Sequence, residues 1–407
     1  MPENVMAAHE DDPTRFYAYR PRDLIVGACD ASFVAGELER RVGRANDNGR
    51  LGQLVKFLLP EGVSAMKTLA DIRGVMDPRR RGSVNLNVIM SLGYHGGFHC
   101  PHPPRPAEAP PPSSVAKEAG SGIRVGLIDT GVAEHSELEE HLDRPADGSF
   151  DVPNENHSDM LHHGGGHGTF AAGLILRNAP GATIVPRRWV ESDGLIDDWT
   201  LAEALGELAG LEGDKKIDMI NLSFGGHTPD DMGLPATAEA LRLAFAKNPS
   251  LVVVAAAGND HSARPFYPAA HKQVVSVGAL DSQGERAWFS NYGPWVDACA
   301  PGVDVVSTFL DKRATHGQSL MIHRLPGLGP QLFDGHASWS GSSFTAPQVT
   351  GAIAAKMSGR RDGAALPGPQ AMAGLAADRA ATPVPQLGVR IPTDVFERSA
   401  TQPAAAS

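Results

Sequence analysis

The chain is poor in cysteine, in aromatic residues and in long apolar runs. Its three cysteines, Cys29, Cys100 and Cys299, are widely separated, a spacing that suits neither a disulfide framework nor a zinc site, so reduced thiols are expected. No apolar run approaches the roughly 18 residues that a membrane-spanning helix needs. Residues 1–15 carry acidic side chains where a signal peptide would have an apolar core. These absences predict a soluble, cytoplasmic protein.

An excess of positive charge is also missing. The chain has 36 Lys and Arg against 47 Asp and Glu, which gives a formal net charge of −11. Nucleic acids and anionic membrane surfaces bind clustered basic side chains, so neither is expected as a partner. Glycine and proline are plentiful instead, with 45 and 32 residues. Many tight turns are therefore expected.

A stretch rich in proline, alanine and serine divides the chain. Residues 101–122 show no hydrophobic periodicity and are predicted to be an inter-domain linker. Residues 1–100 contain three strand-like apolar runs with helical segments between them, which indicates a small β-α-β-α-β domain of the α+β class. Residues 123–380 form a larger domain, and residues 381–407 are predicted to be a flexible tail.

Strand-like runs alternate with helical segments through the larger domain. This alternation produces right-handed βαβ crossovers, so we expect an α/β fold with a doubly wound, mainly parallel sheet and helices on both faces. In such a sheet, functional groups gather at the carboxyl ends of the strands.

Four polar or glycine-rich segments follow strands or begin helices in this domain. They contain Asp129, His167, Asn259 and Ser343. Each segment alone is explained by a turn or a helix cap. Together they supply a hydroxyl nucleophile, an imidazole base, a carboxylate that orients the base, and an amide donor for an oxyanion. Acyl transfer requires this combination.

The order Asp, His, Ser is that of subtilisin, and residues from about 121 to 357 resemble the subtilisin family of serine peptidases, the subtilases. Eight segments match family motifs in the expected order: Asp129-Thr130-Gly131 with His135 and Leu138, His167-Gly168-Thr169 with Ala172-Gly173, Asn221 to Gly225, Ala257-Gly258-Asn259, Tyr267-Pro268-Ala269, Phe289 to Gly293, Ala300-Pro301-Gly302, and Gly341 to Pro347. Matches in this number and order are highly specific.

The resemblance implies a serine endopeptidase that forms an acyl-enzyme. Ser343 would be the nucleophile, His167 the general base and then the general acid, and Asp129 the orienting carboxylate. Asn259 and the backbone N–H of Ser343 would form the oxyanion hole. An extended peptide or protein substrate would bind along a further set of residues: Ser223, Phe224, Gly225, Ala257 and Gly258.

Phe266 occupies a family position at the floor of the S1 pocket that is often small. A phenylalanine there implies a shallow pocket. We therefore expect small P1 residues to be preferred over large aromatic ones.

Metal sites receive little support from the sequence, and the resemblance implies that catalysis requires no cofactor. Four histidines fall within eleven residues: His157, His162, His163 and His167. Their spacing is not His-Glu-x-x-His, and Gly164 to Gly166 would break a helix that aligned them, which favours a solvated loop with one catalytic member. Structural calcium, which many family members bind, is an open possibility without a clear motif. The acidic candidates are Asp193, Asp197, Asp198, Asp230 and Asp231.

Two interpretations of the N-terminal domain are open. It is either an inhibitory pro-domain in contact with the peptidase domain, which implies a latent zymogen and self-cleavage between Met90 and Ile123, or a permanent substrate-recognition domain. A subtilase fold kept only to bind peptides is disfavoured, because all four catalytic groups are present.

Overall fold

The computed structural model describes residues 5–8, 16–43, 46–92, 102–146, 148–151, 160–162, 164–191, 193–311, 321–322, 331–358 and 365–395. The chain divides into two compact units. The first contains Met1–Met90, Ile196–Gly210 and Gly226–Pro249, and the second contains Ser91–Leu195, Leu211–Gly225 and Ser250–Ser407.

An antiparallel sheet is the centre of the first unit. Its strands follow the order β5-β2-β4-β3, and β1 pairs with β2. Leu24 of β2 lies opposite Phe57 of β4 and Leu86 of β5, so one apolar row crosses the sheet. Helices α1 and α2 pack on β2 and on each other. The elements are β1 (Met6–Ala8), β2 (Tyr17–Gly27), α1 (Ala31–Val42), β3 (Asn46–Leu51), β4 (Leu54–Leu58), α2 (Ala65–Val75), the 3-10 helix η2 (Pro78–Ser83) and β5 (Val84–Ser91).

Two further helices, α4 (Asp198–Gly210) and α5 (Pro235–Lys247), belong to the same unit. The buried carboxylate of Asp198 accepts hydrogen bonds from the backbone N–H and the hydroxyl of Thr237, 2.8 and 2.7 Å away, at the start of α5. Asp197 accepts from Arg20 at 2.9 Å and from Asn87 at 3.1 Å. Charged and polar contacts therefore join these helices to the N-terminal sheet within the unit.

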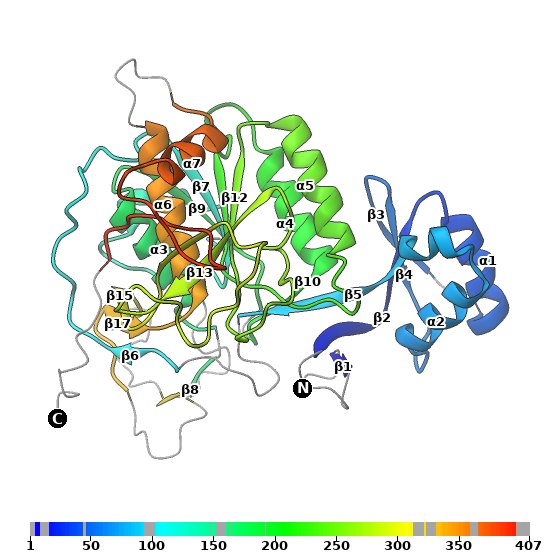
Figure 1. Cartoon of the computed structure of the whole chain (residues 1–407). Helices are drawn as coiled ribbons and strands as arrows, with labels where there is room; N and C mark the ends of the chain where they lie inside the picture. The colour runs from blue at the N-terminus through cyan, green and yellow to red at the C-terminus, as the bar shows by residue number, and fades with distance from the viewer. Residues whose placement is uncertain are drawn as a thin grey trace. The chain divides into compact units, whose positions relative to one another are not determined.

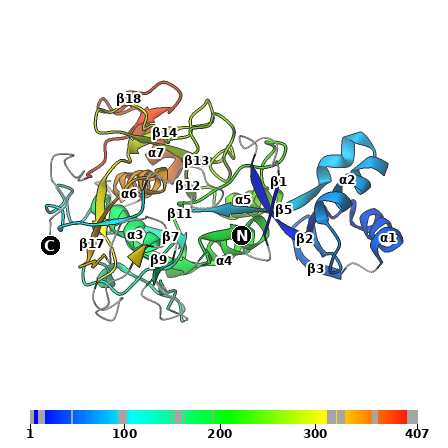
Figure 2. The same cartoon turned by 90° about the horizontal axis from the view of Figure 1, so that it is seen from below.

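A sheet of eight strands lies at the centre of the second unit, in the order β18-β19-β14-β13-β12-β11-β7-β9. Every neighbouring pair is parallel except β18 with β19. Figure 2 shows β11 to β14 following one another across the sheet. The strands are β7 (Arg124–Asp129), β9 (Thr183–Arg188), β11 (Met219–Leu222), β12 (Val252–Ala256), β13 (Val274–Leu280), β14 (Ala298–Pro301), β18 (Thr382–Pro383) and β19 (Val389–Arg390).

Continuous apolar runs explain why these strands are central. Every residue of β12 is buried, as expected for a parallel strand covered on both faces. Helices α3 (His167–Asn178) and α6 (Thr345–Ser358) pack together, and α7 (Gly368–Ala376) packs on α6 (Figure 1). The core between helices and strands includes Ile175, Val254 and Ile353. The predicted α/β fold with a mainly parallel sheet is confirmed.

Shorter elements complete the second unit. β6 (Arg105–Pro106) and β15 (Val305–Thr308) flank β17 (His336–Trp339), while β8 (Met160–Leu161) pairs with β16 (Met321–Ile322). β10 (Leu195–Asp197) leads into α4. The 3-10 helices are η3 (Glu139–His141), η4 (Gly213–Lys215) and η5 (Ser342–Phe344). Among the described helices, none is long and apolar enough to cross a membrane.

The described part of the predicted flexible tail is built into the second unit. β19 extends the main sheet beside β14, and Leu387 and Ile391 are fully buried. Asp394 forms an ion pair of 2.7 Å with Arg177 and accepts the backbone N–H of Ser114 at 2.6 Å. The prediction of a flexible tail is therefore wrong for residues 381–395, while residues 396–407 lie outside the described residues. The same contacts hold part of the Pro-rich segment 101–122.

Candidate active site

The predicted orienting carboxylate and the predicted general base come from the end of one strand and the start of one helix. Asp129 is the last residue of β7, and His167 is the first residue of α3. The Nδ1–H of His167 donates to Oδ1 of Asp129 at 2.8 Å, and both side chains are buried. A Cβ on Gly168 would lie 2.1 Å from the carbonyl oxygen of Gly131, so only glycine lets α3 begin this close to the turn after β7.

Aromatic rings enclose the imidazole of His167. The ring of Trp339 lies edge-on to it with centroids 5.6 Å apart, and the ring of Phe344 lies 5.3 Å away. Among the described residues, Nε2 of His167 has no hydrogen-bond partner. Because Nδ1 is held by Asp129, Nε2 is the nitrogen that is available to receive a proton.

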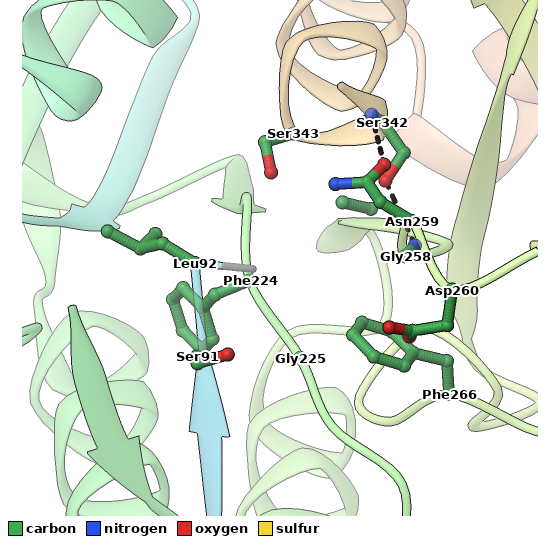
Figure 3. Close-up of a pocket in the computed structure, with 11 residues that line it drawn as sticks. Ser91, Leu92, Phe224, Gly225, Gly258, Asn259, Asp260, Phe266, Ser342 and Ser343 are labelled. Carbon is green, nitrogen blue, oxygen red and sulfur yellow. Dashed lines mark hydrogen bonds between the residues drawn. The ribbon is translucent and has the colours of Figure 1, made fainter. Parts of the chain in front are cut away.

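The predicted nucleophile and the predicted amide donor lie together on the other side of the site. Ser343 lies in η5, directly before α6. The N–H of Ser342 donates to Oδ1 of Asn259 at 2.8 Å, and the hydroxyl of Ser342 accepts the N–H of Gly258 at 2.9 Å. With Oδ1 used in this way, the amide nitrogen of Asn259 is left as a donor, and Figure 3 shows it on the side of the Ser343 hydroxyl. The start of α6 adds a positive helix-dipole end.

A small pocket opens beside Ser343 and Asn259. Its volume is about 40 Å³, room for about three water molecules at 10–15 Å³ each and far less than an aromatic ring needs. A Cβ on Gly225 would lie 2.3 Å from the ring of Phe266, and a Cβ on Gly258 would lie 2.9 Å from the same ring. The ring of Phe266 therefore lies between Gly225 and Gly258, and it fits there because neither glycine has a side chain. Phe266 limits the depth of this pocket (Figure 3).

The sequence model of the subtilase family matches residues 120–375, more than half of the chain. The chain belongs to the subtilase family. Subtilisin BL of Lederbergia lenta is 33% identical over 244 residues, which cover 58% of this chain and 76% of the relative. The thermophilic serine proteinase of Bacillus sp. (strain AK1) is 33% identical over 228 residues, which cover 53% of each chain. The protein is thus a hydrolase of the subtilisin type.

Solved structures share the fold of this subtilase. Fervidolysin from Fervidobacterium pennivorans, a keratinolytic enzyme related to subtilisin, matches with a TM-score of 0.56 at 19% identity, over 83% of this chain and 55% of that one. A cold adapted subtilisin-like serine proteinase matches with a TM-score of 0.51 at 22% identity, over 73% of this chain and 96% of that one.

The subtilase carries an extended segment of its own along the pocket. The N–H of Ser91 donates to the carbonyl of Gly225 at 2.9 Å, and the N–H of Gly225 donates back to the carbonyl of Ser91 at 3.2 Å. The N–H of Leu92 donates to the carbonyl of Gly194 at 3.1 Å. Ser91 and Leu92 also line the pocket, where Figure 3 shows them beside Gly225. This pairing is the way an extended peptide adds to a strand edge.

The predicted substrate-binding residues divide into two groups. Phe224, Gly225, Gly258 and Phe266 line the pocket, whereas Ser223 and Ala257 are not among the residues that line it. The hydroxyl of Ser223 accepts a hydrogen bond from the amide of Asn221 at 2.9 Å, and the carbonyl of Ala257 accepts one from the amide of Asn291 at 2.9 Å. These two residues stabilise the walls.

The metal candidates have other contacts or lie outside the described residues. Within the described ranges, no group of three or more His, Cys, Asp and Glu side chains could hold a metal ion. His157 and His163 lie outside those ranges, whereas His162 and His167 lie within them. The acidic candidates accept protein hydrogen bonds: Asp193 from Leu195, Asp197 from Thr200, Asp198 from Thr237, and Asp230 from Met232. Asp231 has a left-handed backbone.

Sequence reasoning missed one carboxylate near the triad. Asp151 is buried, and its Oδ2 accepts the N–H of Gly166 at 2.7 Å, directly before His167. The pKa of Asp151 is raised to about 8, first by burial and also by the charge of Asp129, while hydrogen bonds and Arg188 act in the opposite direction. Sixteen sequence positions separate it from His167, and no motif marks it.

Proposed function

We propose that this subtilase is a serine endopeptidase that uses Asp129, His167 and Ser343 as a triad. The observation that carries this proposal is the buried 2.8 Å hydrogen bond between His167 Nδ1 and Asp129 Oδ1. It leaves Nε2 as the base in a site whose pocket is lined by Ser343 and Asn259.

In the proposed reaction, Nε2 of His167 takes the hydroxyl proton as Ser343 Oγ attacks the peptide carbonyl. Asp129 stabilises the imidazolium that forms. The N–H of Ser343 and the side-chain amide of Asn259 donate to the oxyanion, and His167 then gives its proton to the leaving amine. Water repeats the sequence on the acyl-enzyme. No cofactor takes part in these steps.

The pocket supports a preference for small P1 residues. Phe266 fills the space between Gly225 and Gly258, and about 40 Å³ is left. An aromatic P1 side chain would have to displace the ring of Phe266. Glycine or alanine fits without this displacement.

A second proposal concerns regulation: the full chain is a self-inhibited precursor. Its support is the pairing of Ser91 with Gly225 and of Leu92 with Gly194, which uses the backbone groups that a substrate would need. The sequence continues with Gly93 and Tyr94, which lie outside the described residues. Because the pocket suits a glycine at P1, we place the self-cleavage after Gly93.

Ser343→Ala tests both proposals, with the exposed Ser282→Ala as the matched control. Fluorophosphonate should label wild type and the control but not Ser343→Ala. The intact mass should show cleavage after Gly93 in wild type and the control only. Labelling of Ser343→Ala would refute the nucleophile, whereas a labelled but uncleaved wild type would refute self-cleavage alone.

A further inference from the structure

Asp151 is a carboxylate beside the triad that the proposed reaction does not use. It belongs to the segment 148–151, which runs against the turn after β7. A Cβ on Gly131 would lie 2.7 Å from the backbone nitrogen of Asp151 and from the carbonyl of Phe150. Gly131 has a φ of 95°, which favours glycine. The turn after β7 therefore requires glycine at position 131, and this lets the carboxyl group of Asp151 lie close to Asp129.

The first contact of Asp151 holds the start of the helix that carries the base. Its Oδ2 accepts the N–H of Gly166 at 2.7 Å. Gly166 is the N-cap residue of α3, with a φ of 81°, and no side chain of its own caps the helix. The first N–H groups of a helix lack partners within it and need acceptors from outside the helix. Asp151 supplies an acceptor one residue before His167.

The second contact runs through Thr130. The hydroxyl of Thr130 donates to Asp151 Oδ2 at 3.4 Å and accepts the N–H of Gly168 at 3.2 Å. The backbone N–H of Thr130 donates to Oδ1 of Asp129 at 2.8 Å, the oxygen that also accepts from His167. Together with the backbone from Asp129 to Thr130 and from Gly166 to Gly168, these hydrogen bonds form a closed ring that includes Asp129, His167 and Asp151. Each member restricts the position of the next.

We propose that Asp151 is a positioning residue, which fixes the start of α3 and, through Thr130, the carboxylate of Asp129, so that His167 keeps its hydrogen bond to Asp129 during turnover. This inference rests on the proposed triad.

The positioning role of Asp151 should be visible in the pH dependence of kcat/KM, because charged groups lie near its carboxyl group. Among the described residues, Asp129 on β7 and Arg188 on β9 are the charged groups that act on Asp151. Burial raises the pKa of Asp151 to about 8, so the group is mostly neutral at pH 7 and ionises as the pH rises through about 8. A second negative charge near the triad favours the imidazolium that forms in the transition state. We expect kcat/KM of wild type to rise a few-fold across this range.

The test compares Asp151→Ala and Asp151→Asn with the exposed Glu134→Gln, each as purified after self-cleavage, with kcat expressed per fluorophosphonate-titrated site. Asp151→Ala removes the acceptor and should lower kcat about 10–100-fold, the scale of a displaced catalytic group. KM should stay within about twofold. Asp151→Asn keeps an oxygen acceptor and should recover most of this loss, but without the rise above pH 8. Glu134→Gln should match wild type.

Two results would overturn the positioning role. One is equal kcat and an equal pH profile in wild type and both Asp151 variants. The other is a lower unfolding temperature with unchanged kcat per titrated site, which would make Asp151 structural only. Failure of the triad proposal is distinguishable, because wild type would then neither cleave itself nor react with fluorophosphonate.

Discussion

The two sides of the active site are held by different kinds of contact. On the acid–base side, the ends of β7 and α3 bring Asp129, His167 and Asp151 into one buried hydrogen-bond network. On the binding side, neutral groups hold the nucleophile and the oxyanion donor in place, through the bonds of Ser342 to Asn259 and Gly258. The rate of the chemical step and its pH dependence should follow from the first side. Substrate choice should follow from the second.

This difference also separates the physical causes of a mutational effect. A change on the acid–base side alters charge in a place that water does not reach, where electrostatic interactions are strong. A change on the binding side alters shape in a pocket of about 40 Å³. We therefore expect kcat effects from the first and changes in P1 preference from the second.

Asp129→Asn should have a larger effect than a change to Phe266 or His271 on the binding side. The amide keeps the size of the side chain but loses the charge that stabilises the imidazolium and holds its tautomer, and the expected loss in kcat is about 10⁴-fold. KM should change little. Peptide hydrolysis at several pH values measures both constants.

Asp281→Asn is the matched control for this substitution. Asp281 follows β13 as Asp129 ends β7, but within the described part of the chain its carboxylate accepts turn N–H groups, from Gln283 and Glu285. The control should retain wild-type kcat. A loss of less than tenfold in Asp129→Asn would contradict the assignment of charge-dependent chemistry to this side.

Phe266→Ala should have a smaller effect and change specificity. Removing the ring opens the pocket between Gly225 and Gly258, and hydrophobic-pocket changes of this kind are worth about 1–3 kcal/mol. The ratio of kcat/KM for P1 Phe over P1 Ala should rise about 10–100-fold, as measured with a matched peptide library. Thermal unfolding would report the cost of the cavity.

Trp288→Ala controls for the loss of an aromatic side chain, since Trp288 is 57% exposed. Its P1 preference should equal that of wild type. An unchanged preference in Phe266→Ala would show that another group sets the depth of the pocket, and the proposal of small P1 residues would fail.

The groups on the two sides of the active site could not be predicted equally well from the sequence. Asp129, His167, Asn259 and Ser343 each lie in a short motif at a strand end or helix start, so the fold class and the motifs together indicated that they meet. Asp151 lies in a segment without periodicity. Its contacts with Gly166 depend on the path of that segment in space, which no spacing rule describes.

Long-range packing explains the other differences. Residues 381–395 are rich in small and turn-forming residues, and the burial of Leu387 and Ile391 depends on β14, far away in the sequence. β3 has the polar sequence Asn46 to Leu51 and is a strand because it pairs with β4. Local apolar periodicity indicates neither case.

His271 gives the smallest effect and tests whether a buried histidine on the binding side stays neutral. Its ring lies 4.9 Å from that of Tyr267, close to Phe266 in sequence, and burial lowers its pKa to about 4. In the unfolded chain a histidine has a pKa of about 6.5. Between these values the unfolded state binds more protons, so stability contributed by neutral His271 is present at pH 7 and is lost as the pH falls through this window.

His271→Phe should remove this dependence. Both proteins carry Ser343→Ala, which prevents self-digestion, and the one that keeps His271 is the parent. Between pH 7 and pH 5, the free energy of unfolding of the parent should fall by about 1–2 kcal/mol more than that of His271→Phe. Urea unfolding at both pH values measures this difference, and His141→Gln, a partly exposed histidine, is the control. Equal losses in the parent and in His271→Phe would mean that His271 is charged in the folded protein at pH 5. The binding side would then carry a charged histidine at pH 5, and P1 preference would change with pH along with the chemical step.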